Sequence, residues 1–491
     1  MRVLEPIHRG KDSAVSWLPL IMIVFLVKYI LYFLDPFPMF FLGDSYSYIT
    51  TSLTGWIPPD RSFVYGFVIK LIAVSAKSLS PLIAVQIFTS GLNAVLVSYV
   101  LIHFFSLPPR LASLLGLLCA LEPLQLLYER YVMTEAFSLF FFAVYIVFSF
   151  HYLKRPRLIF LIFIQILGTG LISLRLSLLP IVLINAILLP LLILSSLRET
   201  YPTKLESMKD FFSRSSPWRL IMGKVVLHII ISLVLTYSLH YGYRSLNGYL
   251  SLNPPAYQYQ DGIFLLAFLG PIVKPIDFPE TNLRDTVFNH LKYNLKDRLQ
   301  RAGNHWQPGG LIAQLNFAVP NSLEANSLAR QTAFNALKRD PIGVARLAFS
   351  GFLDYWNRDL LRACMSNDRG DRPLPEDLLQ VLRKRFNLSG DDLPYLRTFT
   401  NQYFFKAWAW YLFLLCLPIT CFLNFFVQKQ GKLRFHLIIF IASFLVVSIS
   451  SLLIEGPTVR YLHPLGWLSF LVIGTFLHQI QNRLNPKGGN T

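Results

Sequence analysis

The stretch TEAFSLFFFAVYIVFSFHYLKRPRLIFLIFIQILGTGLISL, residues 134–174, decides the fold. It contains two apolar runs, 134–153 and 158–174, which are separated by the basic tetrapeptide KRPR at 154–157. A helix needs about 20 apolar residues to cross a hydrocarbon core of about 30 Å. The stretch therefore predicts two helices that cross a bilayer and reverse direction at a basic loop.

Similar apolar runs recur along the whole chain of 491 residues, of which 54% are apolar and 15% charged. Soluble proteins carry about 25% charged residues, and the mean hydropathy of +0.47 excludes a disordered, fibrous or small disulfide-bonded protein. We expect an all-α polytopic membrane protein with about ten transmembrane helices. The predicted spans lie at 15–34, 80–105, 111–127, 134–153, 158–174, 176–197, 219–241, 403–427, 434–454 and 461–480.

The net charge of +18 follows from this topology and does not require nucleic acid as a partner. Cytoplasmic loops of membrane proteins collect Lys and Arg, and the basic loops here fit a chain with both termini in the cytoplasm. No small-residue cleavage motif follows the first apolar run, so we expect a retained anchor and not a removed signal peptide. The charge bias favours a bacterial inner membrane.

Three parts of the chain differ in composition. We expect 1–241 to form an N-terminal membrane region, 242–402 one mainly helical extracytoplasmic domain, and 403–491 the last transmembrane helices and a cytoplasmic tail. The segment 61–77 is apolar but basic, which is typical of a helix that lies along the membrane interface.

Carboxylates gather at the predicted outer ends of the spans, where they are costly unless they face a cavity or a partner. They are Asp35, Asp44, Asp60, Glu122, Glu129, Glu135 and Glu455. Asp44 and Glu135 are our main candidates for an outward-facing polar site. Each also has a purely structural interpretation, because Asp44 follows Gly43 in a turn and Glu135 with Thr134 can cap a helix.

Arginines lie on the same predicted side, at positions 61, 130, 175 and 460. A guanidinium at such a depth needs an anion, and a phosphate suits its planar set of donors. The alternative is a pair that joins helices, such as Arg460 with Glu455 or Arg130 with Glu129.

Several motifs follow a distinctive order. The aspartate after the first span is followed by R-x-x-x-Y-G-F at 61–67, Gln86, Met-Thr-Glu at 133–135, Arg175, and R-Y-x-x-P at 460–464. This order resembles the GT-C superfamily of integral-membrane glycosyltransferases, above all its bacterial protein-mannosyltransferase-like and aminoarabinose-transferase-like branch. The resemblance covers roughly 15–200 and 403–480, and the outer region 242–402 has no part in it.

The resemblance implies an enzyme that takes a sugar from a polyprenyl-phosphate-linked donor and works at the extracytoplasmic face. Asp44 matches the position of the family's proposed base, and Glu135 matches its second acidic position. Asp44 lacks an adjacent Asp-Asp, Asp-Glu or Asp-x-Asp signature, which puts metal dependence in doubt. Asp44 and Glu135 remain the candidates for holding a divalent cation such as Mg²⁺ or Mn²⁺.

The chemistry of inversion fits these residues. One carboxylate, Asp44, can remove the proton of the acceptor hydroxyl, while Arg175 and Arg460 stabilise the departing lipid phosphate. The acceptor can be a glycan, a lipid or a protein, and membrane lipids surround the enzyme. We assign to substrate binding the residues Glu135, Tyr48, Arg61, Tyr461 and His463.

The sequence lacks a P-loop, a dinucleotide-binding glycine motif, a zinc-binding cluster and a G-x-S-x-G elbow, which argues against nucleotide-driven pumps and common hydrolases. We expect all four cysteines to be unpaired.

Two other functions stay open. A lipid or sugar transporter would use the same acidic face, but it usually carries inverted repeats. A polyprenyl-glycan polymerase or ligase would place its key residues in the large outer region.

Overall fold

The computed structural model describes residues 17–200, 217–292, 305, 309–369, 374–389, 398–425, 432–452 and 456–484. Within these ranges the chain forms helices and no β-strand, and an isolated parallel bridge joins Met39 to Tyr131. The cysteines are free, as far as the described residues extend. Glu455 and the predicted cytoplasmic segment 1–13 lie outside the described residues.

Among the described helices, six are long and apolar enough to cross a membrane. They are α1 (Trp17–Leu34), α4 (Ser80–His103), α7 (Glu135–Lys154), α9 (Leu179–Thr200), α11 (Pro217–Ser251) and α23 (Leu433–Leu452). A seventh crossing can be formed by α21 (Trp408–Leu415) and α22 (Leu417–Phe425), which meet at a bend of 45°. The other predicted spans correspond to α5 (Pro109–Ala120) with α6 (Pro123–Tyr128), α8 (Leu158–Leu174) and α24 (His463–Leu484). The protein is therefore a helical integral membrane protein, and the count of ten crossings stays a prediction.

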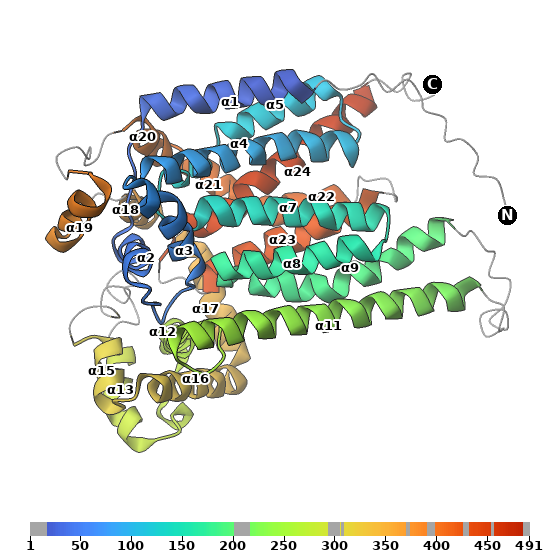
Figure 1. Cartoon of the computed structure of the whole chain (residues 1–491). Coiled ribbons are helices and arrows are strands. Elements are labelled where there is room, and N and C mark those ends of the chain that lie inside the picture. The colour runs from blue at the N-terminus through green and yellow to red at the C-terminus, as the bar shows by residue number, and fades with distance from the viewer. Residues whose placement is uncertain are drawn as a thin grey trace.

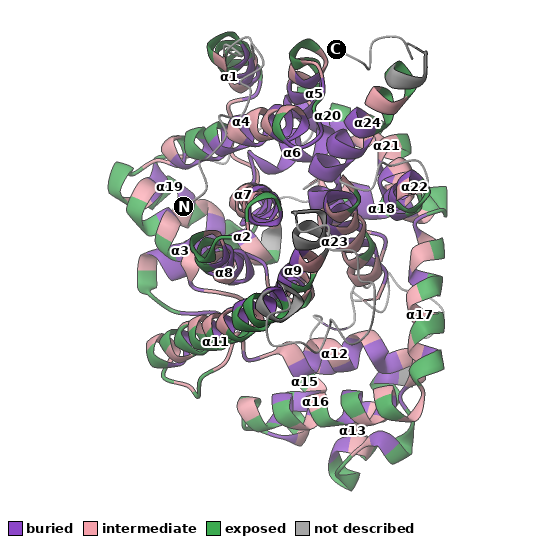
Figure 2. Ribbon diagram, turned by 90° about the vertical axis from the view of Figure 1, so that its right-hand side faces the viewer, coloured by how far each residue is buried: buried purple, intermediate pink, exposed green. Residues whose placement is uncertain are grey.

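The long helices lie side by side in one bundle (Figure 1). Viewed along the bundle, α7 lies near the middle with mostly buried residues, whereas α1 and α11 lie at the edge and expose one side (Figure 2). The last helix, α24, contacts α4, α5, α7, α22 and α23. Its fully buried Trp467 donates a hydrogen bond of 3.0 Å to the carbonyl of Asn93. The bundle thus has one continuous apolar core that fixes the start of α24.

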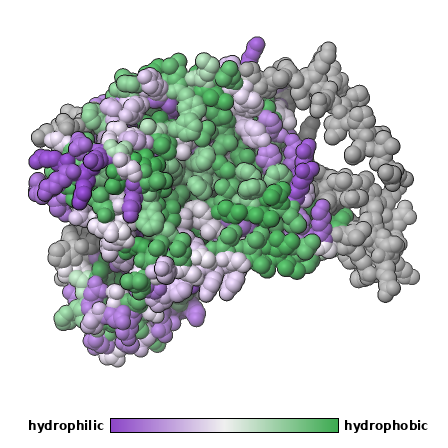
Figure 3. Space-filling view, in the orientation of Figure 1, coloured by the Kyte–Doolittle hydropathy of each residue, from purple (hydrophilic) through white to green (hydrophobic). Residues whose placement is uncertain are grey.

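On the face seen in Figure 3, a broad apolar band covers the bundle between more polar regions toward its two ends. Large exposed apolar side chains on α1 contribute to it, including Leu18, Met22, Leu26 and Phe33. An apolar surface of this extent is costly in water, but lipid chains solvate it.

A small layer of helices covers one end of the bundle, at the left of Figure 1. It contains α2 (Leu42–Thr54), α3 (Val64–Ile69), a π-helical turn (Lys70–Val74) and α19 (Glu376–Phe386). Its buried residues, which include Ile49, Tyr65, Ile69, Leu378 and Leu382, form a separate apolar cluster. The segment predicted to lie along the interface, 61–77, forms α3 and the π-helical turn.

Gly66 allows α2 and α3 to approach closely. A Cβ atom at this position would lie 2.4 Å from Cγ2 of Thr51 and 3.3 Å from the carbonyl oxygen of Tyr48. Gly66→Ala must therefore push the two helices apart, and we expect a cost of about 1–3 kcal/mol from overpacking. A lower melting temperature of the detergent-solubilised protein would show it. Gly223→Ala, which meets nothing within 4 Å, is the matched control, and equal melting temperatures of the two variants would contradict the expectation.

The described residues of 242–402 pack in three separate places. The helices α12 (Asp261–Leu269), α13 (Thr281–Lys292), α15 (Leu311–Ala318) and α16 (Ser322–Arg339) enclose a core of their own. The next helices, α17 (Pro341–Asp354) and α18 (Arg358–Asp368), return to the bundle, where α17 contacts α23. Tyr355, Leu361 and Met365 join the main core, and α19 packs in the end layer.

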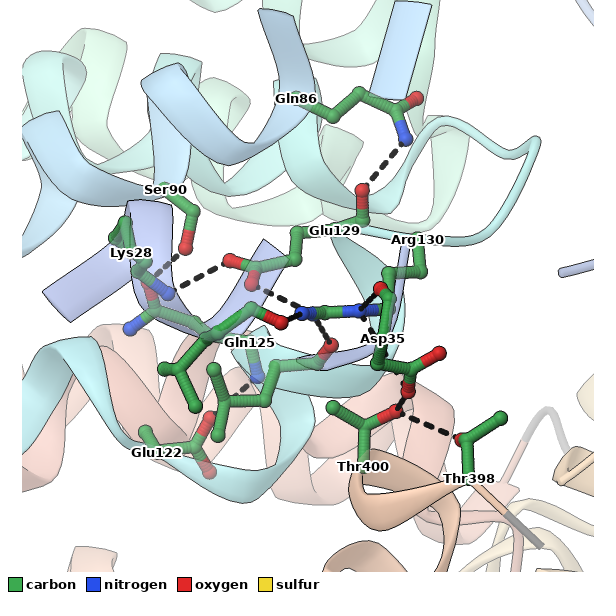
Figure 4. A network of polar contacts seen from close by, with 12 residues as sticks. Lys28, Asp35, Gln86, Ser90, Glu122, Gln125, Glu129, Arg130, Thr398 and Thr400 are labelled. Carbon is green, nitrogen blue, oxygen red and sulfur yellow. Dashed lines mark hydrogen bonds and ion pairs between the residues drawn. The ribbon is translucent and has the colours of Figure 1, made fainter. Parts of the chain in front are cut away.

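A buried charged network fixes the end of α1 (Figure 4). The ammonium of Lys28 lies 2.7 Å from Oε2 of Glu129, whose other oxygen accepts a hydrogen bond of 2.8 Å from Arg130. Arg130 also donates to the backbone carbonyls of Leu31 and Asp35, at 2.8 and 2.9 Å. These contacts clamp the end of α1 to the turn before α7.

The same turn guides the chain into α2. The backbone N–H of Met39 donates to the carbonyl of Arg130 at 2.8 Å, and the N–H of Val132 donates to the carbonyl of Met39 at 2.9 Å. Asp35 accepts a hydrogen bond from Thr400 at the start of α20 (Phe399–Lys406). Arg130 and Glu129 therefore form the helix-joining pair that the sequence left as an alternative, and they hold the segment that precedes α2.

Candidate active site

Asp44 lies in the first turn of α2, where a carboxylate is favoured by the positive end of the helix dipole. Its Oδ1 lies 2.8 Å from Arg61, and its Oδ2 lies 2.7 Å from Arg460. The carboxylate is 20% exposed, so it remains reachable from outside. Asp44 therefore does more than terminate a turn after Gly43, because it joins two arginines from distant parts of the chain.

Arg61 precedes α3 and also pairs with its neighbour Asp60. Its guanidinium lies over the ring of Tyr48, at 5.5 Å from the ring centroid. Tyr48 packs edge-on against Tyr65, whose hydroxyl donates to Gln86 of α4 at 2.6 Å. Burial raises the pKa of Tyr48, and the guanidinium of Arg61 opposes that rise. These contacts connect the predicted R-x-x-x-Y-G-F motif and Gln86 directly.

Glu135 is the first residue of α7 and is completely buried. Its Oε1 accepts a hydrogen bond from Nε of Arg460 and lies 3.9 Å from Nη1 of Arg175. Its Oε2 has no hydrogen-bond partner. The side chain of Thr134 makes no capping hydrogen bond, so the predicted helix cap is not formed by this residue.

Arg460 connects the two carboxylates from the 3-10 turn Val459–Leu462. Its backbone carbonyl accepts a hydrogen bond of 3.1 Å from Arg175, whose guanidinium lies 4.9 Å from the centroid of the Tyr461 ring. A series of side-chain contacts thus runs from Asp44 through Arg460, Glu135 and Arg175 to Tyr461. It brings together α2, α7, the end of α8 and the turn before α24.

His463 begins α24 and lies beside Tyr128 of α6, with 5.4 Å between the ring centroids. The ring is buried, and neither of its nitrogens has a hydrogen-bond partner. One cluster contains the proposed site residues Asp44, Tyr48, Arg61, Glu135, Arg175, Arg460 and Tyr461, whereas His463 packs against Tyr128.

Opposing effects act on the pKa of Asp44. Burial raises this pKa, but the positive charges of Arg460 and Arg61 outweigh burial and lower it to about 2. The carboxylate is therefore ionised at neutral pH and accepts hydrogen bonds, but it is a weak base in the ligand-free protein.

The predicted shared cation does not fit this arrangement. Asp44 and Glu135 both contact the guanidinium of Arg460, which takes the place between them that a bridging ion requires. In the described part of the chain, no group of three His, Cys, Asp or Glu residues could hold a metal ion. We therefore assign the positive charge between the carboxylates to Arg460.

Asp368, the last residue of α18, is a buried carboxylate that the sequence did not nominate. It accepts a hydrogen bond from the hydroxyl of Thr458, and its backbone carbonyl accepts one of 2.6 Å from Tyr131. Thr458 lies two residues before Arg460, so Asp368 holds the turn that presents this arginine. No local pattern distinguished Asp368 from the other acidic residues of 242–402.

Acidification should stabilise the protein through Asp368. Burial raises the pKa of this carboxyl to about 6, against an ordinary value of 3.8, so the folded protein binds more protons than the unfolded chain between these values. Stability should therefore rise as the pH falls from about 6 to about 4. Asp368→Asn should remove this part of the pH dependence. Melting temperatures measured from pH 7 to pH 4.5 test it, and identical pH profiles for both proteins would count against it.

Comparison with family models, curated proteins and solved structures finds no match to this chain.

Proposed function

We propose that this protein is an inverting glycosyltransferase, which moves a sugar from a polyprenyl-phosphate-linked donor to a glycan, lipid or protein acceptor. One observation carries the proposal. Asp44 is a partly exposed, ionised carboxylate, and it lies between the guanidiniums of Arg61 and Arg460. A base next to anion-binding groups is the minimum that displacement of a lipid phosphate from an anomeric carbon requires.

The reaction follows from the chemistry of these groups. The acceptor oxygen attacks the anomeric carbon and loses its proton to Asp44, while the bond between that carbon and the phosphate oxygen breaks. The polyprenyl phosphate leaves with the electron pair of this bond and is stabilised by the guanidiniums of Arg460 and Arg175. A bound phosphate shares the guanidinium of Arg460 with Asp44, so donor binding raises the pKa of Asp44 and makes it a stronger base.

The proposed location is the extracytoplasmic face of a bacterial inner membrane. The cluster lies at the end of the bundle that α2 and α3 cover, whereas the start of α1 and the end of α24 lie at the other end (Figure 1). The loop 154–157 at that other end is basic. This distribution supports cytoplasmic termini and an outward-facing site.

Reconstitution of the full chain in liposomes tests the proposal. Decaprenyl-phosphate-linked mannose, glucose, galactose and arabinofuranose are supplied separately, with a bacterial membrane extract as the source of acceptor. We expect one donor to release decaprenyl phosphate and to lose its labelled sugar to the extract. Movement of the lipid across the bilayer without release of decaprenyl phosphate from any donor would instead support a transporter. Release from pyrophosphate-linked glycans alone would support a polymerase or ligase.

A further inference from the structure

Several buried polar atoms next to Arg460 lack partners. They are Oε2 of Glu135, the hydroxyl of Tyr128 and both ring nitrogens of His463. The three side chains are at most 1% exposed. Buried polar atoms normally form hydrogen bonds, since an unsatisfied group costs about 1–3 kcal/mol. A group of them therefore indicates a polar occupant.

The three side chains are connected to the ion pairs of the candidate site. Tyr128 and His463 lie side by side, and the charges of Arg460 and Glu135 act on Tyr128. Glu135 belongs to the ion pairs and to the unpartnered group, because its Oε1 pairs with Arg460 while its Oε2 has no hydrogen-bond partner. The unpartnered atoms thus adjoin the groups to which we assign the lipid phosphate.

The chemistry of these unpartnered atoms matches hydroxyl groups. A carboxylate oxygen accepts hydrogen bonds, a tyrosine hydroxyl both donates and accepts, and a neutral imidazole offers one donor and one acceptor. A sugar hydroxyl can also donate and accept, so adjacent hydroxyls of one sugar can pair with this set. A second phosphate is disfavoured, because Glu135 would repel it.

We propose that Glu135, Tyr128 and His463 form a sugar-hydroxyl subsite. The proposal rests on the proposed function, and it extends that function by adding Tyr128 and by assigning His463 to hydroxyl binding. The sugar can belong to the donor or to the acceptor. In either case the contribution of Tyr128 to the subsite is its hydroxyl, which forms no hydrogen bond in the ligand-free protein.

A matched pair of tyrosines separates binding from stability. Tyr131→Phe removes a hydroxyl that donates to the backbone carbonyl of Asp368, so we expect a lower melting temperature. Tyr128→Phe removes an unpartnered hydroxyl, so we expect an unchanged or higher melting temperature. Loss of one hydrogen bond of ordinary strength should nevertheless weaken sugar binding about tenfold.

Thermal shifts of the purified full chain then test the subsite, because a ligand that binds the folded state raises its melting temperature. The probes are decaprenyl phosphate, the four decaprenyl-phosphate sugars of the assay above, and free mannotriose as an acceptor mimic. We expect at least one sugar-bearing probe to stabilise the wild type beyond the effect of decaprenyl phosphate, or mannotriose to stabilise it alone. Tyr128→Phe should lose that increment and keep the response to decaprenyl phosphate.

The outcomes distinguish the two proposals. An increment from a lipid-linked sugar assigns the subsite to the donor, and one from mannotriose assigns it to the acceptor. If decaprenyl phosphate stabilises the protein but no sugar increment depends on Tyr128, the subsite is wrong and the phosphate site stands. If no lipid stabilises the wild type, the proposed function itself loses its support. His463→Gln, whose amide can both donate and accept hydrogen bonds, should retain more of the increment than His463→Leu, and equal losses would also contradict the subsite.

Discussion

Asp44→Asn should lower the rate of sugar transfer about 10³-fold, within the range that general-base catalysis contributes. The amide keeps the size of the side chain and can still accept a hydrogen bond from Arg61 or Arg460, but it cannot take up the proton of an acceptor hydroxyl. Single-turnover release of decaprenyl phosphate measures the chemical step, and donor binding should change far less than this rate.

Asp60→Asn is the matched control for this variant. Asp60 pairs with the same Arg61 and is similarly buried, with 12% of its side chain exposed against 20% for Asp44. It does not contact Arg460 in any ion pair of the described residues. We expect Asp60→Asn to keep at least a tenth of the wild-type rate. Equal losses in the two variants would show that the charge balance around Arg61 matters and that Asp44 is not the base.

Arg460→Met should have the largest effect on stability among the site residues. Removing one partner of a buried ion pair costs about 3–5 kcal/mol, because the other charge stays buried without compensation. Glu135 is completely buried, and after the substitution its nearest cation would be Arg175, at 3.9 Å. The free energy of unfolding from an SDS titration should fall accordingly, and transfer from the lipid donor should be lost.

The double variant Arg460→Met with Glu135→Gln separates stability from function. It removes both charges of the buried pair, so most of the lost stability should return, because a neutral replacement of a buried pair is often tolerated. Transfer should not return, since the guanidinium that holds the donor phosphate is still absent. Recovery of transfer together with stability would mean that Arg460 only joins helices.

The membrane-spanning helices could be predicted because each depends on local sequence. The run 134–153 is apolar over the length that a bilayer requires, and α7 covers nearly the same residues. The prediction of one continuous helix over 111–127 was less accurate. Glu122 and Pro123 interrupt it, so α5 ends at Ala120 and α6 starts anew, with Glu122 as its cap. Hydropathy alone does not resolve such a break.

Part of the candidate site could be predicted from charged residues at the ends of the predicted spans, where a charge is costly. This criterion selects Asp44, Glu135, Arg175 and Arg460. The structure brings these four residues together in one cluster. The pairing within it depends on tertiary structure, and Arg460 contacts Glu135 from 325 residues away.

Other site residues gave no signal in the sequence. Tyr128 is one tyrosine among 23, and Asp368 lies in an ordinary polar stretch. Their relevance follows from burial and from the partners that they have or lack, which only the folded chain determines.

A structure of the full chain with decaprenyl-phosphate mannose, or with whichever donor the assay selects, tests the central claim most directly. We predict that the phosphate lies within hydrogen-bond distance of the guanidiniums of Arg460 and Arg175, with the carboxylate of Asp44 on the opposite face of the anomeric carbon. A phosphate bound elsewhere, or an Asp44 on the same face as the leaving group, would contradict transfer with inversion at this site.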